Sequence, residues 1–525
     1  MSAENKRPSF LRGALILTIG SILARFLGLF FKIPLARIVG DYGMGLYAYP
    51  YPIYSFLVAV SVMGLPLAIS KMTSESISLN KYDQAKKIFG LSMSALIILG
   101  LFSSFIIIVF AKPVIHFLGW PEETYISILG LSLTPIFVSY MATYRGFFQG
   151  MQMMTPTSLS QIIESVFRVV VGVGLAYFLM NTKGVAWAAG GASFGATAGA
   201  LAGGILMSIL YKVYKRKGKT VLNMPGVKET ERSSKLLKTL FAIAIPASLA
   251  SVVVSIMNMI NSVTVARCLQ SAGLNLITAT ELWGQLSQKV QTIINVPMMV
   301  GVGLAAALVP AISESFARKN YKDIGDKTSL ALRFVMIIGI PSMIGISVLS
   351  DPIIKLLFGA DSGGGQMLKF LSFECVTSVA YITCQAVLQG MGKMMLPIRN
   401  LAIGAVVKMV LNIILISKPS INIYGIIIAT LIADITILTL NYLSVKKYIK
   451  FKLNKVNVFV KPILSGTIMG ITVYFIFGIA KDIIGSNFSA IVSIAAGGIV
   501  YLAAMLVCGG IEKDEILGLV KRKRA

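Results

Sequence analysis

Ionisable and metal-binding residues are scarce in this chain. Of its 525 residues, only 13% are charged, one is histidine and four are cysteine. The cysteines, at positions 268, 375, 384 and 508, form no Cys-x-x-Cys pair, which argues against a zinc, haem or iron–sulfur site. A Walker motif is also missing, so ATP hydrolysis by this chain is not expected. We therefore predict that the protein is not an enzyme and has no resident cofactor.

Long polar stretches are missing as well. Hydrophobic residues make up 56% of the chain and the mean hydropathy is +0.81, values that no soluble domain of this size reaches. The expected fold class is therefore an all-α polytopic membrane protein. Apolar stretches of about 20 residues mark the spans, and about fourteen are predicted. They cover residues 11–39, 45–70, 88–111, 122–149, 157–180, 184–211, 239–265, 276–315, 328–350, 366–390, 397–417, 422–445, 456–480 and 487–509.

The net charge of +27 comes from basic residues that lie mostly between these spans. If the N-terminus is cytoplasmic, the predicted inside segments, together with Arg12 and Arg399 at the adjoining span ends, hold 32 lysines and arginines, and the outside segments hold six. Such a bias is typical of membrane proteins, whose cytoplasmic loops face anionic lipid headgroups. We therefore predict a multi-pass protein with both termini in the cytoplasm, in contact with membrane lipids and not with nucleic acid.

The chain contains a weak internal repeat. Residues 145–171 read RGFFQGMQMMTPTSLSQIIESVFRVVV, and residues 385–411 read QAVLQGMGKMMLPIRNLAIGAVVKMVL, which places Arg168 opposite Lys408. A second pair consists of GLPLAIS at 64–70 and ALVPAIS at 307–313. Six spans separate the copies, so both copies have the same orientation in the membrane. This predicts two six-helix lobes related by a pseudo-twofold axis along the membrane normal, with a cavity between them.

The same repeat gives the expected domain boundaries. The N-lobe covers residues 1–211 and the C-lobe covers 239–445, with a basic cytoplasmic linker at 212–238 between them. The last two spans and a basic cytoplasmic tail, residues 446–525, follow the second lobe.

Arg25 and Lys32 lie inside the first span, where a cation costs roughly 2.5–3.5 kcal/mol on insertion scales. They are seven residues apart, so they share one helix face about 10 Å apart along the axis. No acidic residue lies in this span. We expect the two cations to face a water-filled cavity and to bind an anionic substrate. The alternative is burial against a carboxylate or carbonyl groups from another helix.

Glu164 and Arg168 are spaced i, i+4 on the fifth predicted span. This spacing predicts an ion pair within the helix, which lowers the cost of burying both charges. Substrate contact by Arg168 is the alternative. Arg145 lies near the end of the preceding span, where its side chain can extend toward the membrane surface.

Four further charged residues are candidates for a functional role. Lys289, which has glutamines at positions 285, 288 and 291 around it, is predicted to contact the substrate, as is Lys408. Asp434 and Glu374 are acidic residues within spans and are predicted to bind a coupling ion, Na⁺ or H⁺. Asp434 could equally be the counter-charge of a buried lysine.

Three segments resemble a known group of transporters: ARFLGLFFKIPLARIVG, RGFFQGMQMMTPTSLSQIIESVFRVVVG and NVPMMVGVGLAAALVPAIS. They are similar to the polysaccharide-export branch of the multidrug/oligosaccharidyl-lipid/polysaccharide (MOP) superfamily. The stage V sporulation protein B type, a relative of the MurJ lipid II flippases, is the branch with the strongest resemblance. The resemblance covers nearly the whole chain and implies the same fourteen spans and two lobes.

The resemblance also implies a function. The group moves undecaprenyl-diphosphate-linked peptidoglycan precursor (lipid II) from the cytoplasmic to the outer leaflet of the bacterial cytoplasmic membrane by alternating access. For this chain we expect a monomeric transporter. The resemblance also implies that the lipid tail of the substrate lies in a hydrophobic groove formed with the last two spans. By this resemblance Arg25 corresponds to a first-span cavity arginine, Lys32 lies near a second arginine, and Lys289 lies near an arginine of the eighth span.

Two other functions remain open alongside this one. A cation-coupled multidrug exporter would have the same architecture, but its cavity needs buried acidic residues, and the charges inside these spans are mainly basic. A non-transporting scaffold for cell-wall synthesis would use the basic loop and tail for docking. Within the first function, the cargo could also be another lipid-linked oligosaccharide.

Overall fold

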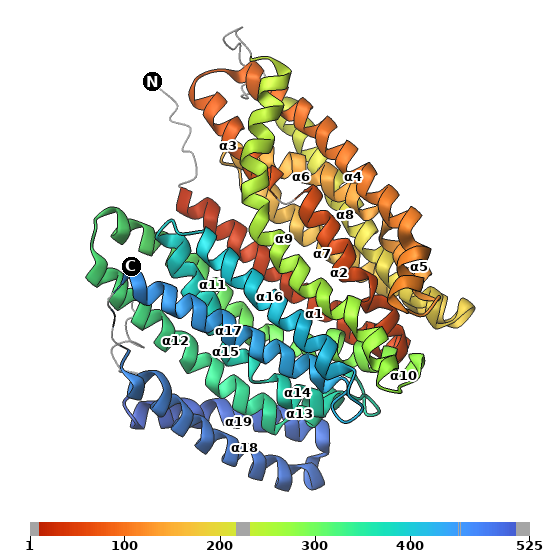
Figure 1. Cartoon of the computed structure of the whole chain (residues 1–525), viewed down its shortest axis with the longest axis vertical. Helices are drawn as coiled ribbons and strands as arrows, with labels where there is room; N and C mark the ends of the chain where they lie inside the picture. Colours follow the sequence, from red (N-terminus) through yellow and green to blue (C-terminus); the bar gives the residue numbers. More distant parts are fainter. Residues whose placement is uncertain (1–9, 63, 217–230, 450, 452, 511–525) are drawn as a thin grey trace. The chain divides into compact units, whose positions relative to one another are not determined.

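The computed structural model describes residues 10–62, 64–216, 231–449, 451 and 453–510, and every regular element within these ranges is a helix (Figure 1). The predicted all-α fold class is therefore confirmed. The chain folds into two compact units. The first unit comprises residues 1–267 and 275–284, and the second comprises 268–274 and 285–525.

The helices of the first unit are α1 (Phe10–Ala48), α2 (Pro50–Ser61), α3 (Leu65–Ser78), α4 (Tyr82–Leu118), α5 (Thr124–Ser132), α6 (Thr134–Gly150), α7 (Thr155–Lys183), α8 (Val185–Arg216), most of α9 (Ser233–Ser271) and α10 (Leu276–Gly284). Within this unit α7 packs against α8 and α1, and α6 packs against α3 and α4. Residues 239–267 group with the first unit, whereas the repeat assigned them to the C-lobe, so the lobe boundaries remain a prediction.

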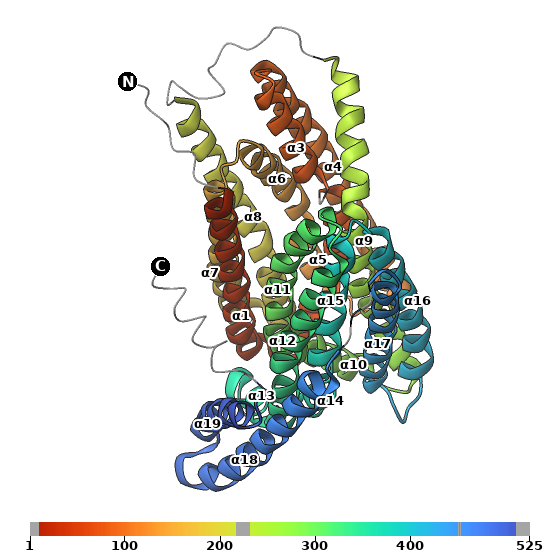
Figure 2. The same ribbon diagram turned by 90° about the vertical axis from the view of Figure 1, so that its left-hand side faces the viewer.

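The helices of the second unit are α11 (Gln291–Ala317), α12 (Tyr321–Val348), α13 (Ser350–Phe358), α14 (Gly365–Leu371), α15 (Glu374–Gly390), α16 (Met395–Ile416), α17 (Tyr424–Tyr448), α18 (Lys461–Ile484) and α19 (Ser486–Val507). Two π-helical turns, η1 (Gln285–Val290) and η2 (Val456–Val460), precede α11 and α18. The last two helices, α18 and α19, lie side by side (Figure 2).

Thirteen helical segments in the described ranges are long and apolar enough to cross a membrane. They coincide with the second to fourteenth predicted spans, and the first predicted span lies within α1. The protein is thus a multi-pass membrane protein, and about fourteen spans are consistent with the structure. Which side of the membrane holds the termini remains a prediction.

Proline and glycine set several helix boundaries. Pro50, Pro66, Pro135 and Pro156 occupy the first two positions of α2, α3, α6 and α7, where the missing N–H has no intrahelical partner to lose. Gly40 interrupts α1 with φ +65°, a left-handed conformation that an L side chain rarely adopts. These residues explain where the hydrophobic segments are cut into separate helices.

The predicted repeat is visible in two helical hairpins, α6–α7 and α15–α16. In each turn, the N–H groups of three consecutive residues donate hydrogen bonds to carbonyl oxygens earlier in the chain. The first N–H group (151 or 391) bonds four residues back, the second (152 or 392) three residues back, and the third (153 or 393) five residues back. The middle residue of each set, Gln152 or Gly392, has positive φ. The glycine before the turn packs on the repeated proline-containing helix in both units: Gly150 on α3, and Gly390 on α11. Gln-Gly-Met therefore forms a tight turn in both copies.

Candidate functional site

The predicted cations of the first span lie on α1. Arg25 falls within this helix, but its side chain is outside the described residues. Lys32 is half-buried, and no carboxylate in the described part of the chain pairs with it. Its surroundings are therefore compatible with the expected anion contact, and its role remains a prediction.

The first unit contains a cluster of two arginines that share one carboxylate; we call Tyr51, Arg145, Ser160, Glu164 and Arg168 the arginine cluster. The guanidinium of Arg145 donates to Glu164 Oε2 at 3.0 Å, and that of Arg168 donates to Glu164 Oε1 at 2.9 Å. Arg145 is held further by a hydrogen bond of 2.8 Å from its Nε to Ser160 Oγ. The predicted ion pair between Glu164 and Arg168 is thus confirmed.

The arginine cluster carries more positive than negative charge. Two guanidiniums surround a single carboxylate, so one positive charge is left over. Arg168 reaches Tyr51 Oη at 3.4 Å, while its Nε has no hydrogen-bond partner among the described residues. Its side chain remains 28% exposed. The cluster therefore has a buried unsatisfied donor and an excess of positive charge, and an anion bound nearby would balance that charge.

Arg145 does not use its place near a span end to extend to the membrane surface. Its side chain is 18% exposed and turns inward to Glu164. The α6–α7 hairpin explains this, because Arg145 precedes the turn and Glu164 follows it on the antiparallel neighbour. The signal in the sequence was an arginine and a glutamate on either side of a Gln-Gly-Met turn.

Aromatic side chains adjoin the arginine cluster on α1 and α2, and sequence reasoning missed them. Phe31, Tyr47, Tyr51 and Tyr54 form a row with ring centroids 5.6–5.8 Å apart. The available signal was YAYPYPIY at 47–54, which places four tyrosines within eight residues. Within the aromatic row, Tyr51 is the residue that accepts a hydrogen bond from an arginine, Arg168. Tyr51 therefore connects the row to the arginine cluster.

The small residues of α8 bring α7 close and so hold the arginine cluster in place. A Cβ at Gly199 would lie 2.4 Å from the carbonyl oxygen of Glu164, and one at Gly195 would lie 2.8 Å from that of Arg168. Small residues permit such close contact between membrane helices. The glycine-rich stretch 188–204 of α8 is thus a packing surface for α7.

The second unit buries a different cluster, formed by Gln291, Glu374, Ser378, Lys408 and Asp434, which we call the acid–lysine cluster. Ser378 Oγ donates to Asp434 Oδ2 at 2.9 Å, and Gln291 Nε2 lies 3.4 Å from each Glu374 oxygen. Lys408 lies within electrostatic range of both carboxylates, although no direct salt bridge joins it to either of them among the described residues. All three charged side chains are less than 8% exposed. Three predicted site residues are therefore neighbours, and their roles remain predictions.

Lys289 lies in the π-helical turn η1. It is 1% exposed, donates to Ser362 Oγ at 3.0 Å, and its ammonium lies 5.7 Å from the centre of the Phe358 ring. The lysine thus contacts the segment that follows α13. Its predicted contact with substrate stays a prediction.

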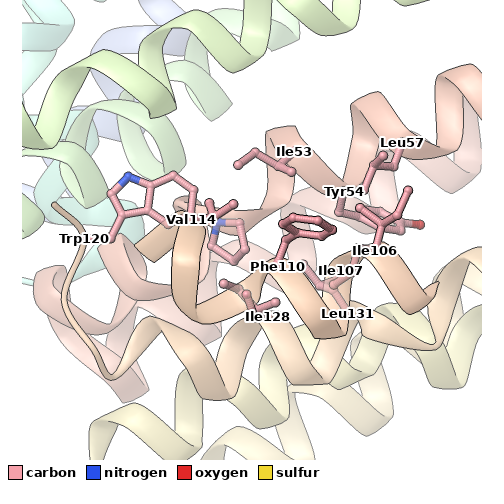
Figure 3. A pocket seen from close by; sticks show the side chains of 12 residues that line it. Ile53, Tyr54, Leu57, Ile106, Ile107, Phe110, Val114, Trp120, Ile128 and Leu131 are labelled. Atoms are coloured by element: carbon pink, nitrogen blue, oxygen red, sulfur yellow. The ribbon is translucent and has the colours of Figure 1, made fainter. Parts of the chain in front are cut away.

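An apolar pocket lies between α2, α4 and α5, beside the aromatic row (Figure 3). Trp120 lies at one end and Leu57 at the other, and Tyr54 belongs both to the pocket wall and to the aromatic row. Its volume is about 60 Å³, and no charged side chain lines it. Unlike the arginine cluster, this pocket has no charged side chain that could bind an anionic headgroup.

Comparison with known sequences places these features in a family context. The model of the family described as polysaccharide biosynthesis protein matches residues 10–316, and the MatE model matches residues 246–414. The lipid II flippase MurJ of Bacillus subtilis (strain 168) is 29% identical over 97% of this chain and 96% of its own length. Stage V sporulation protein B of the same organism is 27% identical, with 97% of each chain covered.

A solved structure gives the same picture of the fold. The lipid II flippase MurJ in an inward closed conformation matches with a TM-score of 0.67 and 18% identity, covering 94% of this chain and 98% of that chain. Homologues of this kind are flippases and transporters, which catalyse no chemical reaction. The expectation that the chain is not an enzyme is therefore confirmed.

Proposed function

The chain belongs to the polysaccharide biosynthesis protein family and is a flippase of the MOP superfamily, and on that premise we propose that its cargo is lipid II. The observation that carries this proposal is the unbalanced positive charge of the arginine cluster. Two of its members lie on α7, which packs against α1, the helix that carries Lys32. Lipid II joins a glycan to an isoprenoid through a diphosphate. Guanidinium and ammonium groups form strong charge-assisted hydrogen bonds to a diphosphate, and the attraction between the charges is stronger in a site of low dielectric constant.

In this proposal Arg25, Lys32 and Arg168 bind the diphosphate, and Lys289 and Lys408 contact the substrate from the second unit. Arg168 offers a planar fork and an unoccupied Nε, which suits an oxygen-rich anion. Lys32 acts as a point charge. Glu164 holds the two guanidiniums of the cluster in position and limits their mutual repulsion.

The substrate moves from the cytoplasmic to the outer leaflet of the bacterial cytoplasmic membrane by alternating access, and both termini are cytoplasmic. The protein acts as a monomer. The long apolar segments support the membrane location, and the excess of basic residues in the predicted inside loops supports the orientation.

Transport is coupled to an ion through the acid–lysine cluster. Glu374 and Asp434 are two carboxylates beside one lysine, so the fully ionised cluster retains one negative charge. A buried unpaired charge is costly, and a proton or a Na⁺ ion would remove it. Asp434 and Glu374 are thus the residues through which either ion couples to transport.

A cation-coupled drug exporter is the second candidate, because buried acidic residues of this kind suit a cationic substrate. The MatE match over residues 246–414 includes Glu374 and Lys408. The lysine weakens this candidate, since it already supplies a cation to the carboxylates. The first unit weakens it further, because its cluster has an excess of positive charge.

The deciding experiment is lipid II binding by purified protein in nanodiscs, with a cationic dye as competitor. Arg25→Ala and Arg168→Ala should lose saturable binding, while Lys71→Ala, which removes an exposed cation of α3, should bind like wild type. The dye should not displace lipid II. Dye binding without lipid II binding would instead support the drug exporter.

A further inference from the structure

A second groove of the first unit lies between α4, α6 and α8. Its volume is about 420 Å³, within the roughly 300–1,000 Å³ that is usual for ligand-binding clefts. Most of its wall is aliphatic or aromatic, with Ile97 from α4, Ile136 and Phe137 from α6, and Leu201, Ile205 and Ile209 from α8. The groove therefore suits a hydrocarbon chain.

The wall on α8 changes character along one helix face. Leu201, Ile205, Ser208, Ile209 and Lys212 all line the groove and recur at helical spacing. They cover roughly 16 Å along the axis. The first part of this stripe is apolar and 40–52% exposed, and the last position is an exposed lysine. The groove is thus apolar along its length and cationic at one end.

Hydroxyl groups add hydrogen-bonding capacity near the cationic end. Tyr140 Oη and Ser208 Oγ lie 2.6 Å apart within the groove, and Tyr140 Oη is also 3.2 Å from Tyr144 Oη. Residues 201–216 contain no carboxylate, so no acidic side chain on this part of α8 competes with a ligand anion for Lys212. An apolar trough that ends in hydroxyls and a lysine complements one acyl chain and its phosphate.

We propose that this groove binds an anionic glycerophospholipid of the leaflet on the Lys212 side. The acyl chain lies along Leu201, Ile205 and Ile209, and the phosphate contacts Lys212. Basic pockets between membrane helices on the cytoplasmic side bind anionic headgroups in this way, and the charge distribution predicts that the Lys212 end is cytoplasmic. The site is separate from the arginine cluster, so it does not depend on the identity of the cargo.

The test is native mass spectrometry of the purified full chain with phosphatidylglycerol or phosphatidylcholine at equal concentration. Wild type should bind phosphatidylglycerol preferentially. Lys212→Ala should lower its affinity about fivefold, the effect of one basic residue near a lipid surface. Lys71→Ala, which removes an exposed cation outside the groove, should not. Equal binding of the two lipids by wild type would overturn the proposal.

A second pair of variants tests the apolar part of the groove. Ile205→Trp should fill it and abolish phosphatidylglycerol retention, whereas Ile98→Trp, at an exposed position of α4 outside the groove, should retain it. A diazirine-bearing phosphatidylglycerol should label the peptide that contains residues 201–212. Labelling confined to α18 and α19, or displacement of the lipid by equimolar undecaprenyl diphosphate, would overturn the proposal. Measuring lipid II binding by the Lys212→Ala variant tests the proposed cargo independently of the phospholipid site.

Discussion

At the scale of single residues, Glu164 is the group on which both guanidiniums of the arginine cluster depend. It accepts from Arg145 and from Arg168 through different oxygens. Each arginine alone could be satisfied by water or by a lipid phosphate. Side by side, the two cations repel one another, and the carboxylate between them offsets that repulsion.

Glu164→Gln keeps the shape of the side chain and removes its charge. We expect the free energy of unfolding to fall by about 2 kcal/mol, less than for a fully buried pair because the three side chains are 16–28% exposed. Thermal unfolding in nanodiscs measures this. The control is Asp83→Asn, which removes an exposed ion pair with Lys86 and should change stability little. Equal losses in the two variants would contradict the shared role of Glu164.

Arg168→Lys separates charge from geometry in the arginine cluster. The lysine still neutralises Glu164 but lacks the planar fork and the unoccupied Nε. Lipid II affinity in nanodiscs should fall about tenfold, because one charge-assisted hydrogen bond is lost, while the melting temperature changes little. An unchanged affinity would show that Arg168 acts only as a partner of Glu164.

At the scale of elements, the paired hairpins α6–α7 and α15–α16 are held by the same kind of contact in both units. Gly150 packs on α3 and Gly390 packs on α11, in each case without room for a side chain. The repeat in the sequence thus corresponds to a repeat in packing, and a substitution at either glycine should have a similar effect.

Gly150→Ala and Gly390→Ala test that equivalence. An added Cβ would lie 2.7 Å from Thr73 Cβ in the first case and 2.7 Å from Ile312 Cβ in the second. Each variant should lose about 1–3 kcal/mol of stability through overpacking, measured by thermal unfolding. Gly174→Ala on α7 is the control, because nothing lies within 4 Å of its Cβ and alanine favours the helix. The equivalence fails if only one of the two hairpins is affected.

Hydropathy predicted the spans well because burial in lipid requires long apolar helices, whatever their partners. It did not predict the break at Gly40, the division between α5 and α6, or the π-helical turn that holds Lys289. These features depend on local backbone geometry, which changes the hydropathy average very little. Arg145 shows the same limit for side chains, since its partner is fixed by how two helices pair.

At the scale of the whole molecule, the two units bury charges of different balance. The arginine cluster of the first unit has an excess of positive charge, and the acid–lysine cluster of the second has an excess of negative charge when fully ionised. The sequence identified Lys408, Asp434 and Glu374 one by one as buried charges. It did not show that they meet, because they come from three helices whose contact is decided by tertiary packing.

The acid–lysine cluster leads to a prediction about coupling. Asp434→Asn removes the negative charge that remains when Lys408 and Glu374 neutralise each other, so the cluster no longer needs an ion. Lipid II binding should persist, because the arginine cluster is intact, while flipping in liposomes should stop responding to a Na⁺ or pH gradient. A variant that still responds fully to both gradients would exclude Asp434 as the coupling residue.

Lys408→Met provides the complementary test of the same charge balance. It leaves two carboxylates without their cation, and breaking a buried pair in this way costs roughly 3–5 kcal/mol. Adding Asp434→Asn removes one of the stranded charges, so the double variant should be more stable than Lys408→Met alone. Thermal unfolding of the two single variants and the double variant gives the interaction energy. Additive effects would mean that Lys408 and Asp434 are neighbours without coupling. A strong interaction would mean that the lysine serves as the cluster's permanent cation, and that one exchangeable ion completes its neutralisation during transport.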